Sequence, residues 1–120
     1  MKPLGAGQMI IRCLVLAAMI EGVTIVFRFG FGWEAAKIVP LLVGPLTGGL
    51  RIHHAYVGLA ATALAAALWR CRPSAARWLL VIGMALALSD AVHHFLVLWP
   101  LVGSPEFHIW IVPLGHWGGL

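Results

Sequence analysis

The chain has 120 residues, of which 62% are hydrophobic and only 10% are charged, whereas an ordinary soluble domain carries roughly 25% charged residues. Eight basic and four acidic side chains are too few to cover the surface of a soluble protein of this length, so the composition argues against a water-soluble fold. The net charge of +4 comes from scattered basic residues rather than from a stripe interleaved with aromatic side chains, which argues against a nucleic-acid partner.

Three apolar segments follow one another along the chain, at about residues 9–29, 53–69 and 78–101. Each is long enough to form a membrane-crossing helix, because a hydrocarbon core of ~30 Å takes about 20 helical residues. Glu21 interrupts the first apolar run and no small-residue cleavage pattern follows it, so we expect a retained span rather than a cleaved signal. The sequence thus predicts an all-α integral membrane protein with three transmembrane helices in a single domain, residues 1–120.

The segments outside these spans have a different composition. Residues 30–50 contain two prolines and several glycines, and their longest apolar stretch is too short to cross the bilayer, which favours an interfacial or re-entrant loop. Residues 102–120 contain two prolines, two histidines and two tryptophans. This composition is typical of a segment that lies at the headgroup level, so we expect an interfacial C-terminal segment.

The basic residues predict the orientation in the membrane, because lysine and arginine are favoured on the cytoplasmic side. Five lie at one set of helix ends, namely Lys2, Arg12, Arg70, Arg72 and Arg77, against Arg28, Lys37 and Arg51 at the other. We therefore expect a cytoplasmic N-terminus and an extracytoplasmic C-terminus. Cys13 and Cys71 adjoin arginines of the first set, where a reducing compartment disfavours a disulfide.

Counting along each helix from its basic end brings the histidine pairs to one depth. Arg12 to Arg28, Arg70 back to His54, and Arg77 to His93 are each separated by sixteen positions (28 − 12, 70 − 54, 93 − 77). At 1.5 Å per residue, all three positions lie ~24 Å from the basic end. A short turn makes the second and third spans antiparallel neighbours, so we expect the pairs His53/His54 and His93/His94 to meet there.

Acidic residues accompany the histidines at this depth. Steps of ~100° along a helix place His93 and His94 on either side of the direction of Asp90, so all three can face one pocket. On the first span, Glu21 and Arg28 are seven positions apart and therefore share a face. Ionisable groups inside a membrane cost several kcal/mol and are usually paired or functional. An ion pair of Arg28 with Glu21 or Asp90 and a role in substrate binding are equally compatible with this pattern.

Imidazole nitrogens and carboxylate oxygens are the donors that zinc, iron or copper would need. The first candidates for metal ligands are His54, Asp90, His93 and His94, followed by His53, Glu21 and His108. Adjacent histidines point ~100° apart, so both members of a pair bind one ion only where the helix start is distorted. Two ions, or one ion with supporting partners, are the alternatives. Candidate catalytic residues near this group are Glu21, Arg28 and Tyr56.

Two partial resemblances accompany these motifs. Asp90–His94 reads Asp-x-x-His-His and resembles, over five residues, the histidine boxes of membrane di-iron desaturases and hydroxylases. The three-span layout is similar to that of the haem-binding anchor subunits of succinate dehydrogenase. The chain differs from the first family in length and in the number of boxes, and from the second in the arrangement around His53 and His54, so we assign it to neither.

Small residues recur every fourth position on the second span, at Gly58, Thr62 and Ala66. This spacing predicts close helix packing, within the chain or between copies of it. The six tryptophans fall near the predicted membrane boundaries and form an ordinary aromatic belt.

The leading functional hypothesis is a small membrane protein with a transition-metal site at the extracytoplasmic boundary, acting on a lipid or another apolar substrate. The first alternative is an anchor subunit of a redox complex that binds haem b through His54 and His93, or a quinone at the same depth. The second is a non-catalytic accessory subunit whose polar cluster pairs with a partner helix. A purely hydrogen-bonded polar network and unrelated interfacial histidines also remain open. Membrane lipids, other membrane subunits and further copies of the chain are the expected partners.

Overall fold

A computed structural model describes residues 4–33, 45–46 and 52–107. All regular structure in these ranges is helical. Helix α1 spans Ala6–Ile25 and continues as a π-helix, η1, over Val26–Gly30. Helix α3 spans His54–Leu68, and α4 spans Pro73–Ala91. A second π-helix, η2 (Val92–Leu98), and the short α5 (Trp99–Val102) extend α4 without a break.

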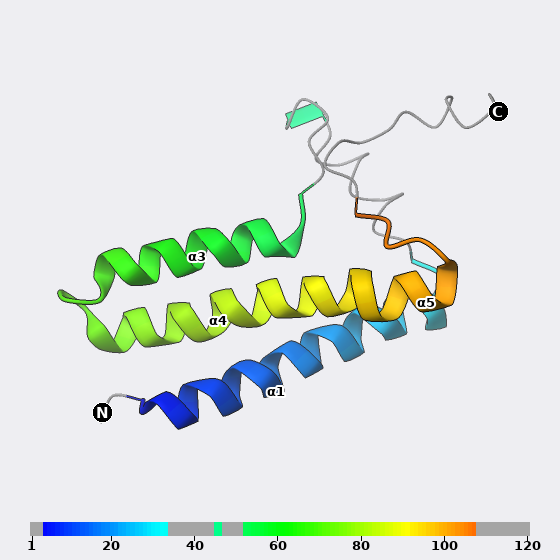
Figure 1. Cartoon of the computed structure of the whole chain (residues 1–120). Helices are drawn as coiled ribbons and strands as arrows, with labels where there is room; N and C mark the ends of the chain where they lie inside the picture. The colour runs from blue at the N-terminus through cyan, green and yellow to red at the C-terminus, as the bar shows by residue number, and fades with distance from the viewer. Residues whose placement is uncertain (1–3, 34–44, 47–51, 108–120) are drawn as a thin grey trace.

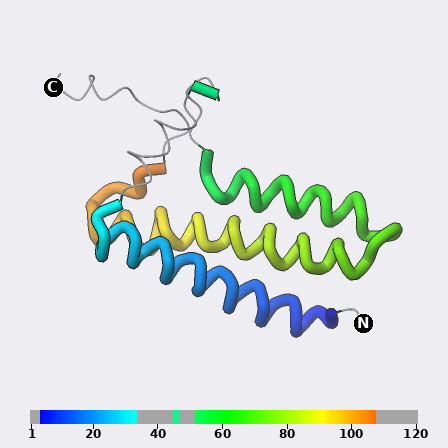
Figure 2. The backbone as a smooth tube through the Cα atoms, turned by 180° about the vertical axis from the view of Figure 1, so that it is seen from behind, coloured from blue at the N-terminus to red at the C-terminus, as the bar shows by residue number. Residues whose placement is uncertain are grey.

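The three long helices lie side by side, with α4 between α1 and α3 (Figure 1). Helix α3 runs antiparallel to α4, whereas α1 runs in the same direction as α4, an arrangement also seen from behind in Figure 2. The four-residue turn at 69–72 brings α3 next to α4, and Pro73 begins α4 because a helix tolerates proline in its first turn. One end of the bundle therefore contains the α3–α4 turn, and the other contains the predicted histidine cluster.

Among the described residues, two helices are long and apolar enough to cross a membrane, Ala6–Gly30 with 25 residues and Pro73–Val102 with 30. The third predicted span is an apolar helix of 15 residues, His54–Leu68. At 1.5 Å per residue this helix is ~22 Å long, shorter than a hydrocarbon core of ~30 Å. By length and composition, therefore, two of the three predicted spans could cross a membrane. The predicted loop and C-terminal segment lie mostly outside the described residues.

The apolar side chains of α1 face outward. Most of the large ones are more than half exposed: Ile10, Ile11, Leu14, Val15, Met19 and Val23. The buried apolar core is small and consists mainly of alanines and single valine and leucine residues, which are Ala17, Ala65, Ala76, Val81, Ala85 and Leu98. An outward apolar face of this kind is what a helix in lipid presents.

Two glycines set the distance between α3 and α4. A methyl group on Gly83 would lie 2.6 Å from the Gly58 carbonyl oxygen and 2.7 Å from Thr62 Oγ1, too close for either atom. A methyl group on Gly58 would in turn lie 2.9 Å from the main-chain nitrogen of Ala87. The predicted small-residue face of α3 thus packs against α4 through Gly58 and Thr62, while Ala65 is buried and Ala66 is exposed.

This close packing predicts a difference between two glycine-to-alanine substitutions. Gly83→Ala should lower the free energy of unfolding by roughly 1–3 kcal/mol, because backbone atoms of α3 cannot move away from the added methyl group. Gly22→Ala on α1 is the matched control, since a methyl group there has no neighbour within 4 Å, and it should leave stability unchanged or raise it by up to about 1 kcal/mol. Denaturation of the purified protein in detergent measures both, and equal effects would contradict the close contact.

Candidate metal centre

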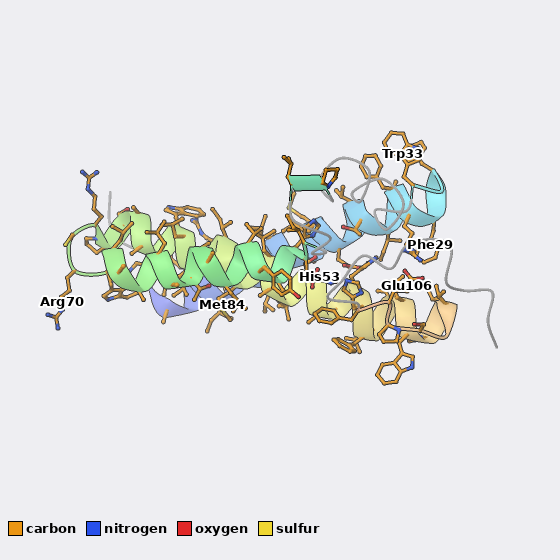
Figure 3. All side chains as sticks on the ribbon, turned by 90° about the horizontal axis from the view of Figure 1, so that it is seen from above. Phe29, Trp33, His53, Arg70, Met84 and Glu106 are labelled. Atoms are coloured by element: carbon orange, nitrogen blue, oxygen red, sulfur yellow. The ribbon has the colours of Figure 1, made fainter. Side chains whose placement is uncertain are left out.

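The site is formed at the end of the bundle where α3 begins and α4 becomes η2. His53 is the residue that precedes α3, in an extended conformation, and Asp90 lies in the last turn of α4. His94 follows four positions after Asp90, so it projects from the same side of the helix. The contact at Gly58 and Gly83 lies between these residues and the α3–α4 turn. Figure 3 shows His53 at this end of the bundle, together with Glu106 and far from Arg70.

His53, Asp90 and His94 form a buried group, with 3%, 6% and 6% of their surfaces exposed. His53 Nδ1 lies 3.7 Å from Asp90 Oδ2, and His94 Nε2 lies 3.8 Å from Asp90 Oδ1. One ligand atom from each residue lies within 4.8 Å of the others. Donors around a tetrahedral ion with metal–nitrogen bonds near 2.1 Å are separated by about 3.4 Å, so a shift of no more than ~1.5 Å would allow these three to share one ion.

Asp90 carries a carboxylate oxygen that needs a partner. Its Oδ2 atom is buried, and among the described residues it has no hydrogen bond. The distances of 3.7 and 3.8 Å to the imidazole nitrogens are too long for direct hydrogen bonds. A buried carboxylate without a partner is costly, and a cation between the three side chains would remove that cost. The arrangement is therefore capable of holding a metal ion.

The backbone carbonyl of Pro105 orients His94. His94 Nδ1 lies 2.6 Å from this oxygen, which can only accept, so Nδ1 is the protonated ring nitrogen and donates the hydrogen bond. The Nε2 lone pair then faces Asp90 and is available to a metal. A hydrogen bond from the remote ring nitrogen to a carbonyl is a common way to orient a metal-binding histidine.

Helix α5 ends at Val102, and after Gly103, whose φ is +80°, residues 104–107 fold back over the site. The ring of Phe107 stacks on that of His53 with centroids 4.3 Å apart and lies edge-on to His94 at 5.2 Å. Glu106 has a φ of +50°, which is unfavourable for a residue with a side chain. Its carboxylate accepts a hydrogen bond of 3.0 Å from Arg28 of η1, and this ion pair ties the segment to α1.

His93 faces α1 instead of the His53–Asp90–His94 group. Its Nδ1 lies 2.9 Å from Glu21 Oε1, and its ring is 5.5 Å from that of His94. Glu21 is buried, and its Oε2 atom has no hydrogen bond among the described residues. The expectation that Asp90, His93 and His94 face one pocket is therefore wrong, because the two adjacent imidazoles point to different neighbouring helices. His94 belongs to the group with His53 and Asp90, and His93 forms a separate contact with Glu21 beside it.

The remaining predicted site residues lie as follows. His54 is exposed and does not belong to the buried group. Tyr56 is half-buried, and its ring lies edge-on to His53 at 5.4 Å. Arg28 pairs with Glu106, so the interpretation that paired it with Glu21 or Asp90 is wrong. His108 lies outside the described residues.

The contacts of residues 104–107 with the site were not predicted from the sequence. Glu106 is one of only four acidic residues in the chain, and Gly103 and Pro105 mark a turn directly before it. An acid next to a turn at the end of the third span was the signal that the chain folds back toward the basic Arg28. The main-chain acceptor at Pro105 carries no such signal, since every residue has a carbonyl.

The hydrogen bond to Pro105 predicts the tautomer of His94. In nitrogen-15 spectra of histidine-labelled, metal-free protein above about pH 8, where imidazole is neutral, His94 should carry its proton on Nδ1. The signals that disappear in His94→Gln assign the ring. A proton on Nε2 in the wild-type protein would contradict the proposed orientation.

The Arg28–Glu106 ion pair predicts a coupling between distant positions. Its side chains are only 13% and 25% exposed, so Arg28→Gln and Glu106→Gln should each destabilise the protein, and the double variant should be less destabilised than the sum by about 1 kcal/mol. Arg12→Gln is the control, because Arg12 packs on Trp78 instead of pairing with Glu106. Additive effects of the Arg28 and Glu106 variants would show that the pair does not form.

No protein-family model matches the chain, and neither a curated protein nor a solved structure is similar to it at a significant level. The functional conclusion therefore rests on the geometry of the site.

Proposed function

We propose that the chain is a three-span integral membrane protein, with one domain over residues 1–120, that binds a transition-metal ion at the extracytoplasmic membrane boundary. Two helices of sufficient length and the outward apolar face of α1 support the membrane location. The third span, α3, is short, and local thinning of the bilayer accommodates a helix of this length. The arginines of the α3–α4 turn support a cytoplasmic N-terminus and an extracytoplasmic C-terminus.

The observation that carries the metal proposal is the buried Asp90 carboxylate between two imidazoles. Oδ2 lacks a hydrogen bond among the described residues, and Pro105 directs the His94 Nε2 lone pair toward the same carboxylate. Two nitrogens and one carboxylate oxygen are donors that zinc, iron and copper all accept. Phe107 shields the group from one side by stacking on His53. A shielded set of three donors with its own orienting hydrogen bond is what a metal site requires.

The proposed chemistry follows from the number of donors. Three protein ligands leave a coordination position for water or a substrate oxygen, where an ion acts as a Lewis acid or generates hydroxide. The exposed side chain of Phe95, whose ring lies 5.8 Å from that of Phe107, favours a lipid or another apolar substrate. Glu21 and His93 lie beside the group and are placed to hold a proton, while Tyr56 packs edge-on to His53.

Metal ion binding fits the described residues better than haem. His54, one of the two expected haem ligands, is exposed, and His93, the other, is hydrogen-bonded to Glu21. The two buried imidazoles have ring centroids 5.0 Å apart with Asp90 beside both, whereas haem requires its axial ligands on opposite faces of a macrocycle. We therefore propose an ion as the cofactor.

Metal titration of purified protein tests the proposal. Detergent-purified, chelator-treated protein should bind about one equivalent of Zn²⁺, and Co²⁺ should give visible absorption bands on occupying the same site. Removing a ligand should weaken binding by about tenfold or more, so His94→Ala and Asp90→Asn should both lose affinity. Binding should also weaken as the pH falls below about 6, because imidazole must be neutral to coordinate.

The matched control is His54→Ala, which removes an exposed imidazole directly beside His53. It should bind metal like the wild type. Wild-type protein that binds less than about a tenth of an equivalent would refute the metal site and favour a hydrogen-bonded network. Equal losses in His54→Ala and His94→Ala would show that the ion is not held by the buried group.

A further inference from the structure

The opposite end of the bundle has a different chemistry. The four arginines described there are Arg12, Arg70, Arg72 and Arg77, whereas the described acidic residues, Glu21, Asp90 and Glu106, all belong to the histidine end. Arg70 projects from the α3–α4 turn at the extremity of the molecule (Figure 3). Within the described residues, the positive charge of this end is therefore not balanced by carboxylates, and it is available to an external anion.

A groove of about 560 Å³ opens beside this turn. Its lining is mostly apolar and includes Thr62, Ala66, Trp69, Arg70, Cys71 and Leu80. The small alanine side chains of α3 leave the space, and Leu80 of α4 and Trp69 bound it. Arg70 is the one charged residue of the lining. The groove thus combines an apolar trough along the helices with a guanidinium at the end where the helices turn.

Arg77 adds a second cation next to the groove. Its guanidinium lies over the ring of Trp69, 5.6 Å from the centroid, and Trp69 itself lines the groove. The Nη1 atom of Arg77 is buried and has no hydrogen-bond acceptor among the described residues. A buried guanidinium N–H without an acceptor is costly. An anionic oxygen bound between Arg70 and Arg77 would supply the acceptor.

We propose that this groove binds one anionic phospholipid, with the phosphate at Arg70 and Arg77 and an acyl chain along Ala66 and Leu80. Guanidinium groups bind phosphate oxygens through two parallel hydrogen bonds, which suits arginine better than lysine. The trough beside them is apolar and long enough to seat part of a hydrocarbon chain, which a free phosphate ion would not use. The lipid site does not depend on the metal site, and the two proposals require in common only that the chain lies in a membrane.

Native mass spectrometry of the purified protein with added lipids tests the assignment. Phosphatidylglycerol should bind more tightly than phosphatidylcholine, by roughly fivefold for each arginine that contacts the phosphate. Arg70→Gln/Arg77→Gln should lose this preference. Arg12→Gln should keep it, because Arg12 lies at the same end but stacks on Trp78 of α4. A preference that survives the double variant, or that is lost equally in the control, would refute the site.

A second pair of variants tests the groove without changing charge. Ala66→Phe fills the trough and should abolish retention of phosphatidylglycerol, whereas Ala63→Phe adds the same side chain at an exposed position of α3 outside the lining. Inorganic phosphate is the third ligand, and phosphate binding as tight as that of phosphatidylglycerol would refute the acyl-chain contact. The metal content of each variant is measured in parallel. Loss of lipid preference with normal Zn²⁺ binding assigns the two ends separate roles, and lipid preference without Zn²⁺ binding would refute the metal site alone.

Discussion

The distance between α3 and α4 governs most of what this protein can do. Gly58 and Gly83 allow the two backbones to approach so closely that a methyl group on either would meet main-chain atoms of the other helix. His53 and Asp90 lie farther along the same two helices, and a wider separation would place them too far apart to share an ion. In lipid, where apolar side chains gain little by leaving the solvent, such close contact between small residues is a main source of helix association.

At the histidine end, the positions of the side chains also depend on contacts from outside the α3–α4 pair. Segment 104–107 contributes a carbonyl to His94, a ring to His53 and a carboxylate to Arg28. The unfavourable positive φ of Glu106 is maintained by its ion pair with η1. The start of α3, the junction of α4 with η2 and the returning segment thus converge on the His53–Asp90–His94 group, while α1 contacts the neighbouring His93 through Glu21.

Much of the fold could be predicted from the sequence because long apolar runs carry a strong and simple signal for helices. The apolar runs predicted three helices, and the count from the arginines to His54 and His93 predicted that the two histidine pairs lie at one level, where the structure brings His53 and His94 together. Which histidine of the pair His53/His54 is buried could not be predicted, since this depends on where α3 begins. His53 precedes the helix and turns inward, while His54 starts the helix and is exposed. The partner of Arg28 could not be predicted either, because Glu106 follows a turn and lies 78 residues farther along the chain.

The acceptor that orients His94 is a main-chain oxygen, and this has a consequence for how the protein tolerates change. Replacing the side chain at position 105 by any residue that keeps the local turn would preserve the hydrogen bond to Nδ1. The imidazole of His94 is thus aligned by the path of the backbone instead of by a second side chain. Evolution could vary the sequence of the returning segment widely while Nε2 of His94 keeps its direction toward Asp90, provided that the turn after Gly103 is retained.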